Sequence, residues 1–150
     1  MKKITSILCL FILILSFFVG CNKDEKDISL DNKSNYATVT TNSNDKEEIG
    51  RLLFEEYLKN TYENYENDDG EIVNILKDYK LNKVNLYEEK ENSFLVEIDF
   101  ETQAIDGYTT VFITGNGIEK EDNWITDQYL IIEIENIEDN KYKMTDLYTG

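Results

Sequence analysis

The chain contains no histidine and no proline, and it has only two cysteines and two methionines. Without histidine, Ser-His-Asp and Cys-His catalysis, histidine acid–base chemistry and the usual zinc sites are excluded. Carboxylates, tyrosine, lysine and hydroxyl groups remain as potential catalytic side chains. Without proline, turns must be formed by residues such as glycine, asparagine and aspartate. We find no motif for a cofactor, a metal or a catalytic group, and we expect none of the three.

Basic residues are scarce: 15 lysines and arginines face 31 aspartates and glutamates, so the formal net charge is −16. Phosphate backbones are bound by clusters of basic side chains, and the few lysines here do not cluster. Nucleic acid is therefore excluded as a partner. The negative field attracts cations and basic peptides over a Debye length of about 10 Å.

The N-terminal segment has the order of a secretory signal. Lys2 and Lys3 precede an apolar run from Ile4 to Val19, and this run ends at the tetrapeptide Phe18-Val19-Gly20-Cys21. A membrane-spanning helix needs about 20 apolar residues, so the run is somewhat short for one. We interpret residues 1–20 as a signal peptide. An uncleaved anchor and a fully secreted protein are the alternatives.

The segment 18–21 resembles the lipobox of bacterial lipoproteins, in which a small residue precedes a cysteine that receives a lipid. The resemblance implies cleavage before Cys21, lipidation of its thiol, and anchoring at the extracytoplasmic face of the cell membrane. Two or more acyl chains anchor a protein stably. Cleavage leaves 13 of the 15 basic residues against all 31 acidic ones, a charge of −18. Since Cys9 leaves with the signal peptide, no thiol remains for a disulfide.

Residues 21–44 are predicted to form the lipidated cysteine and a flexible polar tether, because apolar residues are too few and too scattered to form a core. The alternative is that Tyr36 to Thr41 adds an edge strand to the following domain. Residues 45–150 are predicted to form a single domain.

Two helices are expected at the start of this domain. Asn44 to Glu47 has the spacing of a capping box, which predicts a first helix over 45–65. Its apolar residues form two stripes, so it should contact other elements on two sides. The segment 67–71 contains a second capping spacing, and apolar residues follow at helical intervals to Tyr79. This pattern predicts a second helix.

After Tyr79 the apolar period changes to two, which is typical of strands. Phe94 to Phe100 alternates most clearly, and Glu88 to Asn92 is expected to be the turn before it. Further strands are predicted over 108–114, 125–137 and 141–148, with turns at 115–117 and 139–140. Tyr142 and Met144 should face inward.

The order of these elements resembles the cystatin-like or NTF2-like α+β class, in which helices pack on a curved antiparallel sheet of four or five strands. The combination with a lipobox is similar to lipoproteins of Gram-positive, low-GC bacteria. The resemblance implies a conical pocket between helix and sheet, used for ligands, catalysis or protein contacts. It carries over no catalytic residues, since no motif matches.

Three constellations are candidate sites. An EF-hand centred on Gly70 fails, because its first and twelfth positions would be Tyr65 and Leu76 instead of acids. Glu97, Asp99 and Glu101 project from one face of a strand and could bind a cation or act as a glycosidase pair, but a solvated sheet face is favoured. Trp124 could stack on a sugar or a peptide, but a role in capping the core beside the first helix is favoured.

The leading hypothesis is a membrane-tethered binding module that recognises a protein or peptide of the cell envelope, with Cys21 as its lipidated residue. The alternative is a small-ligand-binding protein whose pocket is lined by Tyr57, Tyr65 and Phe94. A carboxylate-based hydrolase is the third reading, so an enzyme is disfavoured but left open.

Overall fold

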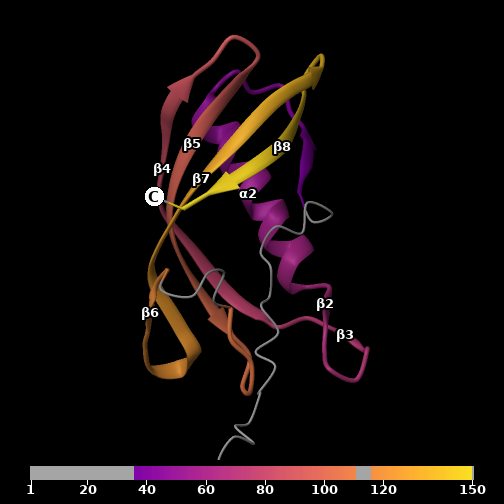
Figure 1. The fold of residues 1–150 in the computed structure, drawn as a ribbon, viewed down its shortest axis with the longest axis vertical. Coiled ribbons are helices and arrows are strands. Elements are labelled where there is room, and N and C mark those ends of the chain that lie inside the picture. The colour runs from indigo at the N-terminus through magenta and orange to yellow at the C-terminus, as the bar shows by residue number, and fades with distance from the viewer. Residues whose placement is uncertain (1–35, 111–115, 150) are drawn as a thin grey trace, which may run out of the picture.

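The computed structural model describes residues 36–110 and 116–149, shown in Figure 1. The predicted signal peptide, Cys21 and the first part of the predicted tether lie outside these residues. The described chain consists of one α-helix, a large antiparallel sheet that curls around it, and a small hairpin.

Helix α2 (Lys46–Tyr62) begins at Asp45, whose carboxylate accepts hydrogen bonds from the backbone N–H groups of Glu47 at 2.9 Å and Glu48 at 3.4 Å. Acidic residues in the first turn and Lys59 in the last turn complement the helix dipole. The predicted first helix is confirmed apart from its ends, but the predicted cap, Asn44, is wrong by one residue.

The large sheet has six strands in the order β1-β8-β7-β5-β4, with the short β6 paired to β7. Their bounds are β1 (Thr38–Thr40), β4 (Leu76–Glu89), β5 (Ser93–Ala104), β6 (Ile118–Glu119), β7 (Trp124–Glu138) and β8 (Lys141–Tyr148). Every pairing is antiparallel, and bulges interrupt the pairing of β5 with β4, β5 with β7, and β7 with β8. These bulges increase the twist, which lets the sheet curl around α2 (Figure 1).

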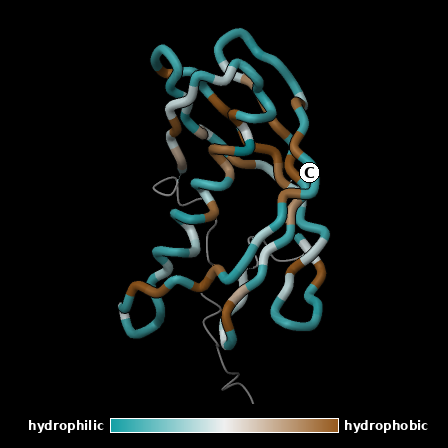
Figure 2. The backbone as a smooth tube through the Cα atoms, turned by 180° about the vertical axis from the view of Figure 1, so that it is seen from behind, coloured by the Kyte–Doolittle hydropathy of each residue, from teal (hydrophilic) through white to brown (hydrophobic). Residues whose placement is uncertain are grey.

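The core lies between α2 and the inner face of the sheet. Leu53, Phe54 and Leu58 of the helix are fully buried. They face alternate residues of the central strands, which are also fully buried: Val96, Ile98 and Phe100 of β5, Leu130, Ile132 and Ile134 of β7, and Met144 of β8. The predicted alternation of β5 and the inward positions of β8 are confirmed, and the turn predicted over Glu88 to Asn92 is present but begins only after β4 ends at Glu89. In Figure 2, apolar residues (brown) recur along the helix and along the strands of the sheet.

The predicted fold class, two helices packed on a sheet, is wrong. The segment expected to form the second helix forms β3 (Ile72–Val73), which pairs with β2 (Tyr65–Glu66), and the start of β4. The Asn67 side chain accepts hydrogen bonds from the backbone N–H groups of Asp69 and Glu71, which closes a hairpin turn at Gly70 instead of capping a helix. Within the described residues the fold is a curled antiparallel sheet around one helix, without the expected layer of two helices.

Two further segments differ from the favoured expectation. The alternative edge strand over 36–41 is confirmed, because β1 pairs with β8 and places Val39 opposite Tyr142. Of the strand predicted over 108–114, residues 108–110 are outside any strand and the remainder is not described. The strand that precedes β7 is β6, on the far side of the predicted turn at 115–117, and a short 3₁₀ turn, η2 (Glu121–Asn123), joins the two.

Candidate functional site

The candidate site is the outer face of the sheet, meaning the side of β4, β5, β7 and β8 that faces away from α2. Solvated faces of antiparallel sheets are normally polar. Here Leu95 and Ile131 alternate with inward-facing neighbours and are nevertheless only 7% and 9% exposed. Three tyrosines share this face with them: Tyr87 of β4, Tyr129 of β7 and Tyr148 of β8. We call these five residues the tyrosine patch.

One carboxylate of the outer face, Glu97 of β5, gathers donors from both neighbouring strands. It forms an ion pair with Lys83 and accepts hydrogen bonds from Asn85 Nδ2 at 3.0 Å and Tyr129 OH at 3.4 Å. The hydrogen bonds from Lys83 and Asn85 lower the pKa of Glu97. The pKa of Tyr129 is raised, mainly by burial and then by the Glu97 charge, so the phenol stays protonated and donates.

A second carboxylate of the outer face, Glu133 of β7, also gathers donors from other segments of the chain. It accepts hydrogen bonds from Lys90 Nζ at 2.9 Å, Ser93 Oγ at 2.8 Å and Tyr148 OH at 2.8 Å. The hydrogen bond from Lys90, followed by those from Tyr148 and Ser93, lowers the pKa of Glu133. The hydrogen bond between Tyr148 and Glu133 raises the pKa of Tyr148 to about 12. Two of the three patch tyrosines are thus held in place by ionised carboxylates.

The predicted acidic ladder of β5 is largely neutralised by β4. Lys83 pairs with Glu97, and Lys80 pairs with Glu101 at 3.2 Å. A glycosidase requires one acid with a raised pKa, whereas the pKa of Glu97 is lowered. Within residues 36–110 and 116–149, no three side chains of the metal-binding types come together. The ladder therefore supports neither the hydrolase nor the cation site.

Asp99, the middle acid of that ladder, is the exception. It lies between Lys83 of β4 and Tyr129 of β7 in the strand register, and its side chain is half-buried. Lys83 is engaged by Glu97, and Asp99 forms no hydrogen bond or ion pair with another residue of the described chain. The centre of the outer face therefore carries an available negative charge beside an ordered phenol.

Trp124 also lies on the outer face, where it pairs with Gln103 at the start of β7. The ammonium group of Lys80 sits 4.1 Å from the centre of its ring, a cation–π contact. The favoured prediction, that Trp124 caps the core beside the helix, is wrong. The ring is a half-buried platform for Lys80.

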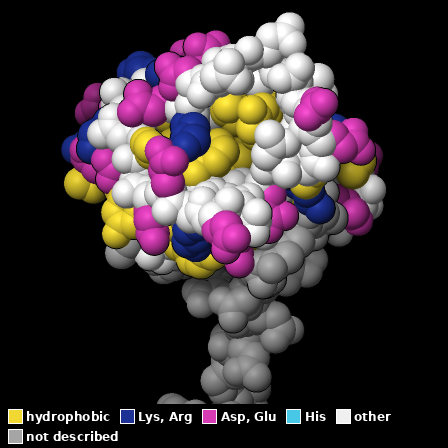
Figure 3. Space-filling view, turned by 90° about the horizontal axis from the view of Figure 1, so that it is seen from above, with side chains coloured by type: hydrophobic (Ala, Val, Ile, Leu, Met, Phe, Trp, Pro, Cys, Tyr) yellow, Lys and Arg dark blue, Asp and Glu magenta, His cyan; other side chains and the backbone are white. Residues whose placement is uncertain are grey.

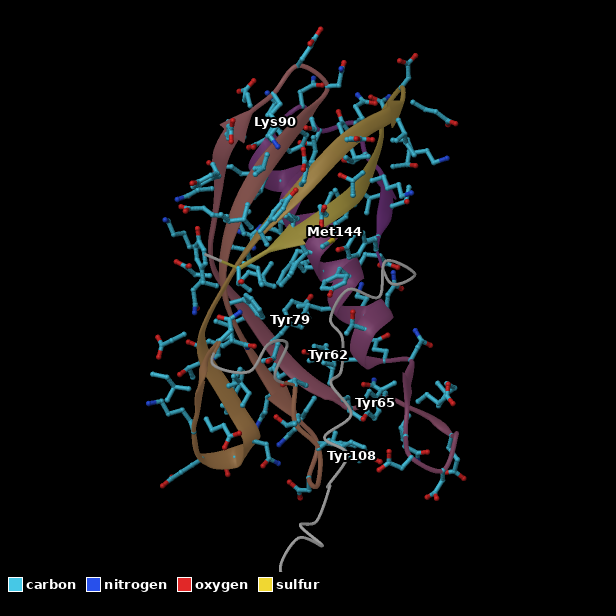
Figure 4. All side chains as sticks on the ribbon, in the orientation of Figure 1. Tyr62, Tyr65, Tyr79, Lys90, Tyr108 and Met144 are labelled. Carbon is cyan, nitrogen blue, oxygen red and sulfur yellow. The ribbon has the colours of Figure 1, made fainter. Side chains whose placement is uncertain are left out.

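The three residues predicted to line a pocket are not brought together. Tyr57 is buried in the core, and Tyr65 packs edge-on against Tyr108 at a centroid distance of 6.1 Å. Figure 4 shows Tyr65 and Tyr108 at the end of the molecule opposite Lys90, near which Phe94 lies. Phe94 does line a depression, but at the other end of the fold from Tyr65.

Sequence reasoning missed Tyr87, Tyr148 and Glu133 as members of a site. The one available signal is the alternation within 125–137, which puts Tyr129 and Ile131 on the opposite side of the strand from Leu130 and Ile132. Which residue of β4 or β8 lies beside them depends on bulges, such as the one between Leu86 and Glu88. The positions of bulges cannot be read from the alternation of apolar residues.

In the part of the chain that the structure describes, no helix has the length and apolar character needed to cross a membrane. No protein-family model, curated protein or solved structure matches this chain. A functional assignment must therefore rest on the geometry of the outer face of the sheet and of the other described residues.

Proposed function

We propose that this chain is a lipid-anchored protein of the extracytoplasmic membrane face, and that it binds a basic protein or peptide through the outer face of its sheet. The observation that carries the proposal is Asp99, a half-buried residue next to the tyrosine patch whose carboxylate forms no hydrogen bond or ion pair with another described residue, since the lysine opposite it, Lys83, is paired with Glu97. The lipid anchor is supported by the lipobox-like segment that ends at Cys21.

The tyrosine patch has the physical properties of a protein-binding surface. Tyrosine is enriched at interface hot spots because it offers a large apolar ring and a polar tip. Tyr87 is 56% exposed and Tyr148 is 39% exposed, although Tyr148 is also fixed by Glu133. Side chains that are ordered before binding lose less entropy when a partner arrives.

The charge distribution selects the chemistry of the partner. The net charge of −16 steers basic molecules toward the domain and repels acidic ones. At the centre of the face, an arginine of the partner could pair with Asp99 and lie flat against the ring of Tyr129. The neighbouring carboxylates Glu97 and Glu133 are already satisfied, so Asp99 is the group with most to gain from a cation.

Crosslinking in intact cells tests this proposal. A photoreactive phenylalanine analogue at position 87 should capture a reproducible partner, whereas the same analogue at the exposed Ile72 of β3 should not. Asp99→Asn should weaken capture by roughly tenfold, the loss expected for one charged pair. Asp139→Asn, in the exposed turn after β7, makes the same change in net charge and serves as the control. Equal effects of the two substitutions would contradict a specific role for Asp99.

The lipid anchor has its own test. Cys21→Ala should leave an unprocessed precursor without a lipid, detected by its larger mass and by the loss of labelling with a radioactive fatty acid. Recovery of a shortened Cys21→Ala protein that still fractionates with membranes would refute the anchor.

A further inference from the structure

A second site lies at the end of the molecule where α2 begins. An open depression of about 450 Å³ is lined there by residues of the first turn of α2, the β4–β5 turn and the β7–β8 hairpin. Figure 4 places Lys90 at this end, and Figure 3 looks onto it from above, where hydrophobic side chains are visible between polar and charged ones. Its floor belongs to the inner side of the fold, where Ile49 and Tyr142 lie, and it meets the outer face only at Lys90 and Ser93, which also bind Glu133.

The floor of this depression is apolar and partly aromatic. Ile49 of α2, Phe94 of β5 and Tyr142 of β8 form it, and the two rings meet edge-on with centroids 6.5 Å apart. All three residues belong to the main core, so the floor is rigid. Phe94 is 6% exposed and Tyr142 is 8% exposed, so the floor offers a fixed but narrow apolar surface to a small ligand.

The rim of the depression is built from uncharged amides. Asn44, Asn92 and Asn136 line it from three different segments, and none of their side chains is hydrogen-bonded to another described residue. On the sheet, by contrast, the amides of Asn82 and Asn85 are bonded to glutamates. Each free amide can donate and accept at once, which suits ligand groups that also do both.

Both lysines at the rim are paired within the protein, and the carboxylate of Glu91 is the one charged group of the lining that forms no ion pair with another described residue. Lys46 is paired with Glu89 and lies 5.7 Å from the centre of the Phe94 ring, while Lys90 is paired with Glu133 at 2.9 Å. Neither ammonium group is left to attract an anion, and the net charge of −16 repels anions from the whole molecule. The depression therefore disfavours an anionic ligand, and the Glu91 carboxylate can accept hydrogen bonds from the hydroxyl groups of an uncharged one.

From this combination we infer a binding site for an uncharged saccharide. A pyranose ring presents an apolar C–H face, which fits an aromatic floor, and hydroxyl groups that both donate and accept, which fit amides. The volume of the depression is within the range of about 300–1,000 Å³ that is usual for small-ligand sites. The site adds a ligand class to the protein-binding face and does not depend on it.

Titration calorimetry of the full chain in sugar-free detergent micelles tests the inference, with maltose, cellobiose and N,N′-diacetylchitobiose as probes. We expect at least one of them to bind with a millimolar or lower Kd. The double substitution Asn92→Ala and Asn136→Ala should weaken that binding at least tenfold. Both residues are exposed, and circular dichroism verifies that the fold is kept. Asn64→Ala, an exposed asparagine beyond the opposite end of α2, is the matched control and should have no effect.

Three outcomes would overturn the inference: no heat of binding from any of the probes, equal weakening by the rim and control substitutions, or binding of glucuronate without binding of the uncharged sugars. Asp99→Asn separates this site from the outer face. It should reduce capture of the protein partner and leave saccharide binding unchanged, so either proposal can fail without the other.

Discussion

Gly50 is a glycine inside a helix whose replacement by alanine should destabilise the protein. In an exposed helix interior, alanine is preferred to glycine by about 1 kcal/mol. Gly50, however, packs against Val96 of β5, and an added Cβ would lie 2.8 Å and 3.0 Å from the two γ-carbons of that valine. Val96 is fully buried and has no room to move aside. Helix propensity and packing therefore oppose each other at this position.

The magnitudes decide the sign. Overpacking a core with an extra methyl group costs about 1–3 kcal/mol, which outweighs the gain in helix propensity. We expect Gly50→Ala to lower the free energy of unfolding by about 1 kcal/mol. Val96→Ala removes both crowded γ-carbons, although it is destabilising by itself because it leaves a cavity. The added Cβ would still lie 3.1 Å from the Cβ of residue 96, but a shift of a few tenths of an ångström into the new cavity relieves that contact, so in this background Gly50→Ala should become stabilising by up to about 1 kcal/mol.

Urea denaturation of the four proteins in this cycle measures the effect. The fluorescence of Trp124, the single tryptophan, reports unfolding, and circular dichroism at 222 nm reports the helix independently. The decisive observation is the reversal of sign between the two backgrounds, which corresponds to a coupling free energy of about 2 kcal/mol. If Gly50→Ala stabilises the unmodified chain, the close approach of α2 to β5 is not as described and the reasoning is refuted.

Two further substitutions test the outer face. Glu133→Gln should lower stability by about 1 kcal/mol at neutral pH, since it removes the charge that Lys90 and Tyr148 bind. Because folding lowers the pKa of Glu133 from its ordinary 4.5, this stabilisation is present above that pH and is lost as the pH falls through the folded value. Chemical denaturation between pH 7 and pH 3 should therefore show that the free energy of unfolding falls less steeply with acid in the variant. An equally steep fall in both proteins would contradict the assignment. Lys80→Ala should expose the ring of Trp124, shift its emission to longer wavelength and cost about 0.5–1 kcal/mol, and an unshifted spectrum would show that Lys80 does not cover the ring.

The strands of the central sheet could be predicted because one physical pattern dominates them. Each must place alternate residues against α2, so Phe94, Val96, Ile98 and Phe100 are apolar while their neighbours are mostly polar. The first helix could be predicted for the same reason, since its buried residues recur at helical spacing. Burial on one side leaves a periodic trace in the sequence whatever the rest of the fold does.

The second predicted helix failed because two structures use the same side-chain chemistry. An asparagine followed by acids and a glycine can cap a helix or close a hairpin, and in both cases its oxygen accepts from backbone N–H groups ahead of it. Asn67 accepts from Asp69 and Glu71, and the following chain pairs as strands. The helical spacing of Ile72 and Ile75 is coincidental, because Ile72 is 62% exposed and Ile75 is buried. Only long-range pairing with β5 decides between the two structures.

The candidate site was even harder to predict, because its ion pairs and hydrogen bonds join side chains of neighbouring strands. Along the sequence, Glu97, Asp99 and Glu101 are three equivalent acids, and nothing local distinguishes them. Register and side-chain direction make them different. Lys80 lies opposite Glu101 and pairs with it, whereas Lys83 lies opposite Asp99 but pairs with Glu97, which leaves the middle acid beside Tyr129 without an ion pair among the described residues. A bulge moved by one residue would exchange these partners. The identity of the unpaired acid, on which the proposed binding depends, is therefore a property of the assembled sheet and not of any one strand.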